Sequence, residues 1–317
     1  MKSWFAVRRL PRIVVPVVLL LVAAAGGSTA VAATASPQPT PGLPVYLALG
    51  DSIANGQQSA PLTSDYWSTV AGWRANGYVA QFDANLVANL NCLPAANANA
   101  KAGCRQLQLL NLARSGVPAM NGQPAKPGVT TQIVIDEQLP AATALLQARN
   151  HDKNPRNDVE VVTLTVGGND IFGPVTTACL SGVTPQCITA IGTAFAAFSV
   201  NYSSILARLR EAAGPDAAII TMTYYNPLPY CNLGAANPAA AKALGDLVLE
   251  GGTVPGGSVL VGFNDLITAI SQQHGAKVAD TFGELGTGDF VGGDDCLHPN
   301  KSGHTKIATA FEKALTP

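Results

Sequence analysis

Short apolar runs alternate with longer stretches of helical character along most of this chain. Five runs have the composition of buried strands: Val45–Gly50, Leu107–Ala113, Val159–Val166, Ala217–Tyr224 and Ala276–Asp280. Helical patterns lie between and after them: Ala141–Arg149 with Pro140 at its start, Thr189–Ala213, Val259–His274 and Asn300–Leu315. Strands that alternate with helices predict one parallel sheet covered by helices on both faces.

Reactive and turn-forming residues follow several of these strands. The motifs are Gly50-Asp51-Ser52 after the first strand, Asn111–Gly116 after the second, Gly167-Gly168-Asn169-Asp170 after the third, and Asp295-Cys296-Leu297-His298 before the last helix. Ligands of such sheets bind beyond the carboxyl ends of the strands. Each motif alone is a weak signal, since Asp51 and Asp170 suit turn or helix capping. Their joint order points to one site.

The chemistry open to these residues is nucleophilic catalysis. A serine hydroxyl such as that of Ser52 needs a base, and the imidazole of His298 is suited to that role near neutral pH. Asp295 lies three residues before His298 and is the expected partner of the second ring nitrogen. Candidate oxyanion donors are the backbone N–H groups of Ser52 and Gly116 and the side-chain amide of Asn169.

The ordered motifs GDS, NLARSG, GGND and DCLHP resemble those of the SGNH (GDSL) hydrolase superfamily, and the similarity spans about residues 45–315. YLALGDSIANG and DDCLHPNKSGH are similar to segments of its secreted bacterial esterases and lipases. The resemblance implies a flavodoxin-like three-layer α/β/α sandwich with a central parallel sheet. It also implies catalytic roles for Ser52, His298 and Asp295, and an oxyanion hole of Ser52, Gly116 and Asn169. His304, on the final helix, is expected to face solvent.

The charge balance and the absence of certain motifs exclude several classes of ligand. The 317 residues include 19 Lys and Arg against 20 Asp and Glu, and the aromatic content is 6%. A chain with net charge near zero and no basic run beyond its N-terminus is not expected to bind nucleic acid. No zinc-ligand spacing, phosphate loop or metalloprotease motif occurs in the sequence. We therefore expect neither a metal nor an organic cofactor.

The N-terminal segment has the pattern of an export signal. Basic residues precede the apolar run Ile13–Ala25, and Ala30-Val31-Ala32 has the small residues of a cleavage site. We expect a signal peptide over residues 1–32, a proline-rich linker over 33–44 and a single hydrolase domain over 45–317. The alternative is an uncleaved anchor on the outer side of the membrane, because residues 13–33 are long enough to span a bilayer.

Six cysteines in an exported chain indicate up to three disulfides, among fifteen possible pairings. Two pairs bracket short polar loops, which favours Cys92–Cys104 and Cys179–Cys187. The remaining pair is Cys231–Cys296, which would link the residues around Asp295 and His298 to the region after the fourth strand.

The sequence thus predicts a secreted, monomeric serine hydrolase that cleaves carboxylic esters, of lipids or of short-to-medium acyl groups, through an acyl-enzyme intermediate. Membrane contact is expected only through the substrate or an uncleaved signal. One alternative is a carbohydrate acetyl esterase. Another, from a different class, is a catalytically inactive binding module on the same scaffold.

Overall fold

The structure is a computed structural model that describes residues 42–58, 66–89, 107–119, 124–179, 181–231, 237–292 and 295–316. All of them lie in one unit of the chain, Pro39–Pro317. The predicted signal peptide, residues 33–41 of the predicted linker, and Cys92 and Cys104 lie outside the described residues.

A five-stranded parallel sheet forms the centre of the fold, with strand order β2-β1-β3-β4-β7. Its strands are β1 (Val45–Gly50), β2 (Gln108–Asn111), β3 (Val159–Thr165), β4 (Ala218–Met222) and β7 (Lys277–Ala279). Counting only these five strands, the order is that of flavodoxin-like doubly wound folds. Every residue of β1 is buried, as the continuous apolar run predicts for a strand covered on both faces.

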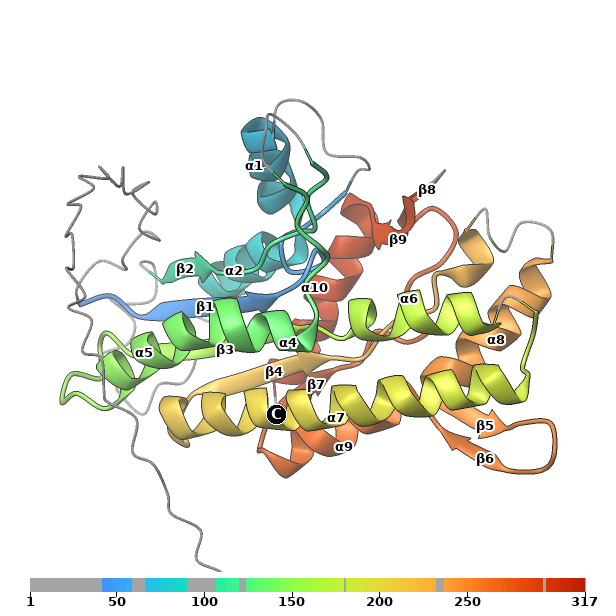
Figure 1. The fold of residues 1–317 in the computed structure, drawn as a ribbon. Helices are drawn as coiled ribbons and strands as arrows, with labels where there is room; N and C mark the ends of the chain where they lie inside the picture. Colours follow the sequence, from blue (N-terminus) through green and yellow to red (C-terminus); the bar gives the residue numbers. More distant parts are fainter. Residues whose placement is uncertain are drawn as a thin grey trace, which may run out of the picture. The chain divides into compact units, whose positions relative to one another are not determined.

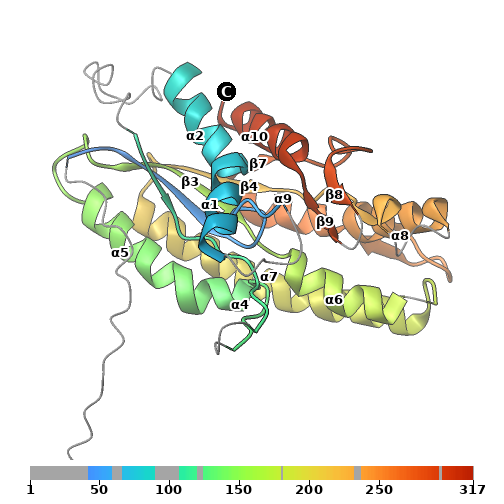
Figure 2. The same ribbon diagram turned by 90° about the horizontal axis from the view of Figure 1, so that it is seen from above.

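Helices cover both faces of this sheet (Figures 1 and 2). One face carries α2 (Tyr78–Asn89) and α10 (Lys301–Leu315), and α1 (Tyr66–Asn76) packs on α2. The other carries α4 (Thr131–Ile133), the π-helical turn η2 (Val134–Gln138), α5 (Leu139–Asn150), α7 (Pro185–Ala213) and α9 (Phe263–Gln273). The helices α6 (Gly168–Cys179) and α8 (Pro238–Glu250) lie beyond the carboxyl ends of the strands. The three-layer α/β/α sandwich is therefore confirmed.

Short elements complete the described chain. The hairpin of β5 (Gly251–Thr253) and β6 (Val259–Val261) follows α8, and β8 (Phe290–Gly292) pairs antiparallel with β9 (Asp295–Pro299). A turn of 3-10 helix, η3, spans Leu228–Tyr230. The predicted helix Val259–His274 is wrong over its first residues, because Val259–Val261 pair with β5 and the helix begins at Phe263.

Helix α7 is the one helix in the described part of the chain whose length and hydropathy meet the criteria for a membrane span. Its apolar side chains, among them Phe198, Tyr202 and Leu206, are buried in the core. The Phe198 ring lies 4.6 Å from that of Phe263 on α9, centroid to centroid. Packing against α5, α6 and α9 accounts for the apolar side chains that are buried on this helix.

His304 does not face solvent, contrary to the expectation from sequence. Its side chain is fully buried on the inner face of α10. The backbone N–H of Tyr78 donates to Nδ1 at 3.2 Å, and Nε2 donates to the carbonyl of Gln57 at 3.3 Å. These two partners require the neutral ring with its proton on Nε2. Burial lowers the pKa of His304 to about 4.

This histidine makes the protein less stable in acid. Its pKa is about 4 when folded and about 6.5 when unfolded, so the unfolded chain binds the proton more tightly. The free energy of unfolding therefore falls as the pH drops from about 6.5 towards 4. Between pH 7 and 5 the wild type should lose about 2 kcal/mol more than His304→Gln. Urea unfolding at the two pH values measures this difference.

The matched control is His151→Gln, which removes an exposed histidine. It should keep the pH dependence of the wild type. Equal losses of stability in His304→Gln and in the wild type would contradict the assignment of the acid sensitivity to His304.

Candidate active site

The turn that carries Ser52 is fixed at its first residue. Gly50 ends β1 with φ of 138°, and a Cβ at this position would lie 2.1 Å from the carbonyl oxygen of Thr165. Glycine is therefore required here. The buried side chain of Gln138 accepts from the N–H of Gly50 and donates to its carbonyl, each at 2.8 Å. Gln138 ends the π-helical turn η2, so this turn aims an amide at the end of the central strand.

Ser52, His298 and Asp295 form one hydrogen-bonded line. The Oγ of Ser52 lies 2.8 Å from Nε2 of His298, and Nδ1 of His298 lies 2.6 Å from Oδ1 of Asp295. Burial alone would raise the pKa of Asp295, but the hydrogen bonds and charge of His298 outweigh it and lower the pKa below its usual value. An ionised Asp295 accepts the Nδ1 proton, which leaves Nε2 free to accept a proton from Ser52.

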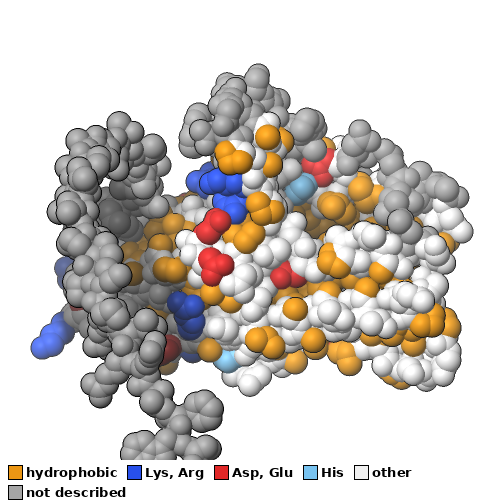
Figure 3. Space-filling view, viewed as in Figure 1, with side chains coloured by type: hydrophobic (Ala, Val, Ile, Leu, Met, Phe, Trp, Pro, Cys, Tyr) orange, Lys and Arg blue, Asp and Glu red, His pale blue; other side chains and the backbone are white. Residues whose placement is uncertain are grey.

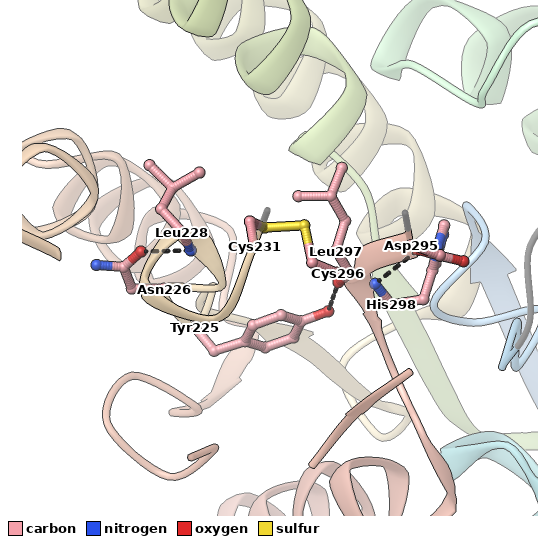
Figure 4. The surroundings of a disulfide bond; sticks show 8 residues. All are labelled: Tyr225, Asn226, Leu228, Cys231, Asp295, Cys296, Leu297 and His298. Carbon is pink, nitrogen blue, oxygen red and sulfur yellow. Dashed lines mark hydrogen bonds and ion pairs between the residues drawn. A yellow bond between two sulfur atoms is a disulfide. The ribbon is translucent and has the colours of Figure 1, made fainter. Parts of the chain in front are cut away.

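Two contacts hold the segment that contains His298 (Figure 4). Cys296 forms a disulfide with Cys231, which follows η3. The hydroxyl of the buried Tyr225 donates to the carbonyl of Leu297 at 3.0 Å. Both anchors come from the segment after β4, so this segment positions the imidazole. A second disulfide joins Cys179 to Cys187, and Cys179–Cys187 and Cys231–Cys296 are the two pairings that the sequence predicts within the described residues.

The side-chain amide of Asn169 is held in place by a hydrogen bond to the backbone. Nδ2 donates to the carbonyl of Val129 at 3.0 Å, which fixes the orientation of the amide group. A second N–H on the same nitrogen remains for another acceptor. Gly128 makes this arrangement possible, since a Cβ there would lie 2.5 Å from Oδ1 of Asn169.

Gly116 lies beside Gly128. It is not among the residues that line the cleft at Ser52, which is described below. A Cβ at Gly116 would lie 3.0 Å from the backbone nitrogen of Gly128. Its loop is held by Val117 and Lys126, whose backbones exchange hydrogen bonds of 2.9 and 2.7 Å. The structure therefore places Gly116 against Gly128, the glycine that contacts Asn169.

Asp51 does more than cap its turn. Its Oδ1 accepts from the N–H of Ile53 at 3.0 Å, and its Oδ2 accepts from the hydroxyl of Tyr224 at 3.2 Å. The same hydroxyl accepts from the N–H of Gly168 at 3.0 Å. Tyr224 thus connects the turn of Ser52 to the first residue of α6. Burial raises the pKa of Asp51 to about 6.

Asp170 caps a helix, as the sequence suggests, but the helix is not its own. Its carboxylate accepts from the hydroxyl of Thr131 at 2.6 Å and from the N–H of the same residue at 3.0 Å. The carboxylate therefore lies at the N-terminus of another helix, α4, where a negative charge is favourable.

A cleft of about 80 Å³ joins these groups. Its lining includes Ser52, Asn169 and His298, three of the residues that the sequence predicts for the site. Asp295 does not line the cleft and lies behind the ring of His298, to which it is hydrogen-bonded. Apolar walls come from Phe172, Pro227 and Leu297. Within the described residues there is no group of three or more His, Cys, Asp or Glu side chains arranged to hold a metal ion.

Several residues of the site lie outside the sequence motifs. Gln138, Gly128, Tyr224 and Tyr225 belong to none of the motifs. Gly128 alone had a weak signal, since it follows Pro127 in a loop near a helix start. Their roles depend on contacts between segments that are remote in the chain.

Comparisons with known proteins show the family and the fold of this chain. The sequence model of the GDSL-like lipase/acylhydrolase family matches residues 48–306. This match spans most of the chain, and the protein therefore belongs to that family, which supports a carboxylic ester hydrolase. Comparison with curated protein sequences gives no match.

One solved structure shows the same fold, and a second is similar. The lipase Lip_vut3 from a goat rumen metagenome is 18% identical, with 85% of this chain and 96% of that chain covered and a TM-score of 0.52. A phospholipase A1 from Streptomyces albidoflavus NA297 is 19% identical, with 85% and 98% covered and a TM-score of 0.49. At such identities the likeness extends to the fold alone.

The Cys231–Cys296 bond should affect turnover more than folding. Without it, the segment of His298 keeps its pairing with β8 and the hydrogen bond from Tyr225 but loses its covalent link to the segment after β4, so the imidazole is less well positioned. In Cys231→Ser/Cys296→Ser, kcat for p-nitrophenyl acetate should fall about tenfold, less than the roughly hundredfold that a full 1 Å misplacement costs. Near-ultraviolet circular dichroism at the assay temperature reports whether the fold is kept.

The matched control is Cys179→Ser/Cys187→Ser, which removes the other described disulfide. This variant should keep kcat for acetate. An unchanged kcat in Cys231→Ser/Cys296→Ser would show that this bond does not position His298.

Proposed function

We propose that this protein is a secreted serine hydrolase that cleaves carboxylic esters through an acyl-enzyme, with Ser52 as nucleophile, His298 as base and Asp295 as its orienting carboxylate. The observation that carries the proposal is the line of hydrogen bonds of 2.8 and 2.6 Å from Ser52 through His298 to Asp295. A serine hydroxyl at this distance from a neutral imidazole nitrogen is the arrangement that activates a nucleophile.

The reaction follows from the positions of these atoms. Nε2 of His298 takes the hydroxyl proton as Oγ of Ser52 forms a bond to the ester carbonyl carbon. The tetrahedral intermediate collapses as the bond to the alcohol oxygen breaks, and that oxygen receives the proton from Nε2. Water then gives its proton to Nε2 and attacks the acyl-serine. Ser52 leaves with that proton, and the carboxylic acid is released.

The oxyanion is assigned to the backbone N–H of Ser52 and the free N–H of Asn169. The Val129 carbonyl orients the Asn169 amide before substrate binds, and donors oriented in advance stabilise the transition state without rearranging. Gly116, the third donor expected from the sequence, is not among the residues that line the cleft and packs against Gly128, which contacts Asn169.

Export is part of the proposal. The bonds Cys179–Cys187 and Cys231–Cys296 are typical of proteins that fold in an oxidising compartment, which is consistent with secretion after removal of residues 1–32. A retained N-terminal anchor would place the same domain on the outer side of the membrane.

Replacement of the nucleophile tests the proposal directly. The wild type should hydrolyse p-nitrophenyl esters, and Ser52→Ala should lower kcat by roughly 10⁶-fold, the effect of losing the serine of such a triad. The Ser52→Ala/His298→Gln double variant should be no slower than Ser52→Ala, because the two groups act as a unit.

Ser203→Ala is the matched control. Ser203 also forms a hydrogen bond of 2.8 Å to a histidine, Nε2 of His274, but it lies on α7 outside the cleft. This variant should keep full activity. Absence of turnover on acetyl, butyryl and palmitoyl esters would favour an inactive binding module, and turnover of acetylated polysaccharide alone would favour a carbohydrate acetyl esterase.

Gly128→Ala tests the role of Asn169 without changing that residue. The new methyl group overlaps the Asn169 amide and displaces it, so kcat should fall towards the loss of about 10²–10³ that follows removal of one oxyanion donor. KM should change little, because the donor acts on the transition state.

Gly173→Ala is the control for this effect, since a Cβ at Gly173 on α6 meets nothing within 4 Å. It should leave kcat unchanged. A wild-type kcat in Gly128→Ala would exclude Asn169 as a donor in its observed position.

A further inference from the structure

Three cavities run in series from Ser52 along the space between α6 and α8. The cleft at Ser52 shares Phe172 with a small cavity of about 20 Å³. That cavity shares Thr176, Leu228 and Leu244 with a groove of about 650 Å³. Phe172 therefore borders both the cleft and the small cavity, and Leu228 borders both the small cavity and the groove.

The groove offers an apolar environment. Its described lining residues are uncharged, and most of them are small or aliphatic, such as Val183, Ala241 and Leu247. The Thr176 hydroxyl donates to the carbonyls of Phe172 and Gly173 in its own helix, so its proton is not offered to a ligand. Hydrophobic side chains also gather on the surface over α6 (Figure 3). A charged group would lose its hydration here without meeting an opposite charge in the described lining.

One face of α6 forms a continuous wall of this path. Phe172, Thr176 and Cys179 follow one another at helical spacing, and the rise of an α-helix places Phe172 about 10 Å from Cys179 along the axis. The first of them lines the cleft and the last lines the groove. A ligand in this space is therefore long and narrow, and runs parallel to α6.

The opposite wall is fixed by the segment that also positions His298. Oδ1 of Asn226 accepts from the N–H of Leu228 at 3.1 Å, and its Nδ2 donates to the carbonyl of Lys242 on α8 at 3.0 Å. Gly245 leaves the room for this amide, since a Cβ there would lie 2.1 Å from Oδ1. Figure 4 shows Leu228 and Leu297 pointing to the same side, with the Cys231–Cys296 bond between them.

We propose that the groove between α6 and α8 holds the hydrocarbon chain of the acyl group, and that the substrates are esters of long-chain fatty acids. This inference rests on the proposed function. The alcohol must leave after the first step, whereas the acyl chain stays bound to Ser52 until water attacks. A path that begins at the cleft of Ser52 and continues into a groove without charged residues in its described lining therefore suits the acyl half of the ester.

The sizes of the cavities separate short chains from long ones. The cleft of about 80 Å³ holds the ester group and a short acyl chain. The groove of about 650 Å³ has the size of a ligand pocket and adds apolar contact for each further methylene. Long chains gain this contact only by displacing Phe172 and Leu228 from the path. The acyl-chain preference of the wild type should therefore rise from acetate to palmitate.

Ala241→Trp tests the groove without touching the cleft. Ala241 on α8 lines the groove, and an indole there fills the space that the chain would occupy. With p-nitrophenyl palmitate, kcat/KM should fall at least about tenfold, or roughly 1.4 kcal/mol, and with p-nitrophenyl acetate it should stay unchanged. The matched control is Ala239→Trp, two positions away on the same helix, exposed and outside the groove lining.

A binding measurement in the Ser52→Ala background separates this inference from the proposed function. Fluorescence titration with cis-parinaric acid, an eighteen-carbon fatty acid, should show an affinity that Ala241→Trp weakens about tenfold and Ala239→Trp does not. The groove assignment would be overturned if Ala241→Trp changed neither palmitate turnover nor parinarate binding. The esterase proposal would still stand in that case, provided that the wild type hydrolyses the acetate ester. Loss of all Ser52-dependent ester turnover would overturn the proposed function, and with it the substrate role of the groove.

Discussion

The hydrogen bond between Ser52 and His298 joins a turn near the start of the fold to a segment just before its last helix. A bond of 2.8 Å tolerates little error in the placement of either partner. The central sheet places one partner, because Gly50 packs on Thr165 of the adjacent strand and is bound by Gln138. The other depends on the Cys231–Cys296 bond and Tyr225. The proposed chemistry requires that these two independent sets of contacts place Oγ of Ser52 and Nε2 of His298 within hydrogen-bond distance of each other.

Burial separates two histidines that the sequence places only six residues apart. His298 lies in a cleft open to substrate and has a carboxylate on its second nitrogen. His304 lies on the inner face of α10, where both ring nitrogens are used by backbone groups and burial holds the ring neutral. The helical pattern of α10 could have indicated this, since His304 falls on the same face as the buried Ile307, Ala308 and Phe311.

The sequence predicts the parts of the fold that depend on local pattern. β1 is predicted to the residue, and β3 and β4 to within a few residues, because buried parallel strands are continuous apolar runs. Helix α6 is not predicted, since Gly173 and Pro174 oppose helix formation and packing against α7 overrides them.

The motifs also predict Ser52, Asn169 and His298 as residues of one site, and all three line the cleft. They cannot lead to Gln138, Gly128 or Tyr225, because the role of each depends on a partner in a remote segment. Gly128 serves Asn169, Gln138 serves Gly50, and Tyr225 serves the backbone beside His298. Such supporting contacts have no fixed spacing in the chain, and any side chain of suitable reach could supply them from another element.

The segment after β4 connects the two functions proposed for this chain. Tyr225 and Cys231 hold the residues around His298, and between them Asn226 fixes Leu228 at the wall of the groove. Both anchors and the wall therefore belong to one short run of backbone. A chain that displaces the Leu228 side chain presses on the same run that positions the imidazole. The anchors of His298 and the wall of the groove thus share one segment that contributes no catalytic residue of its own.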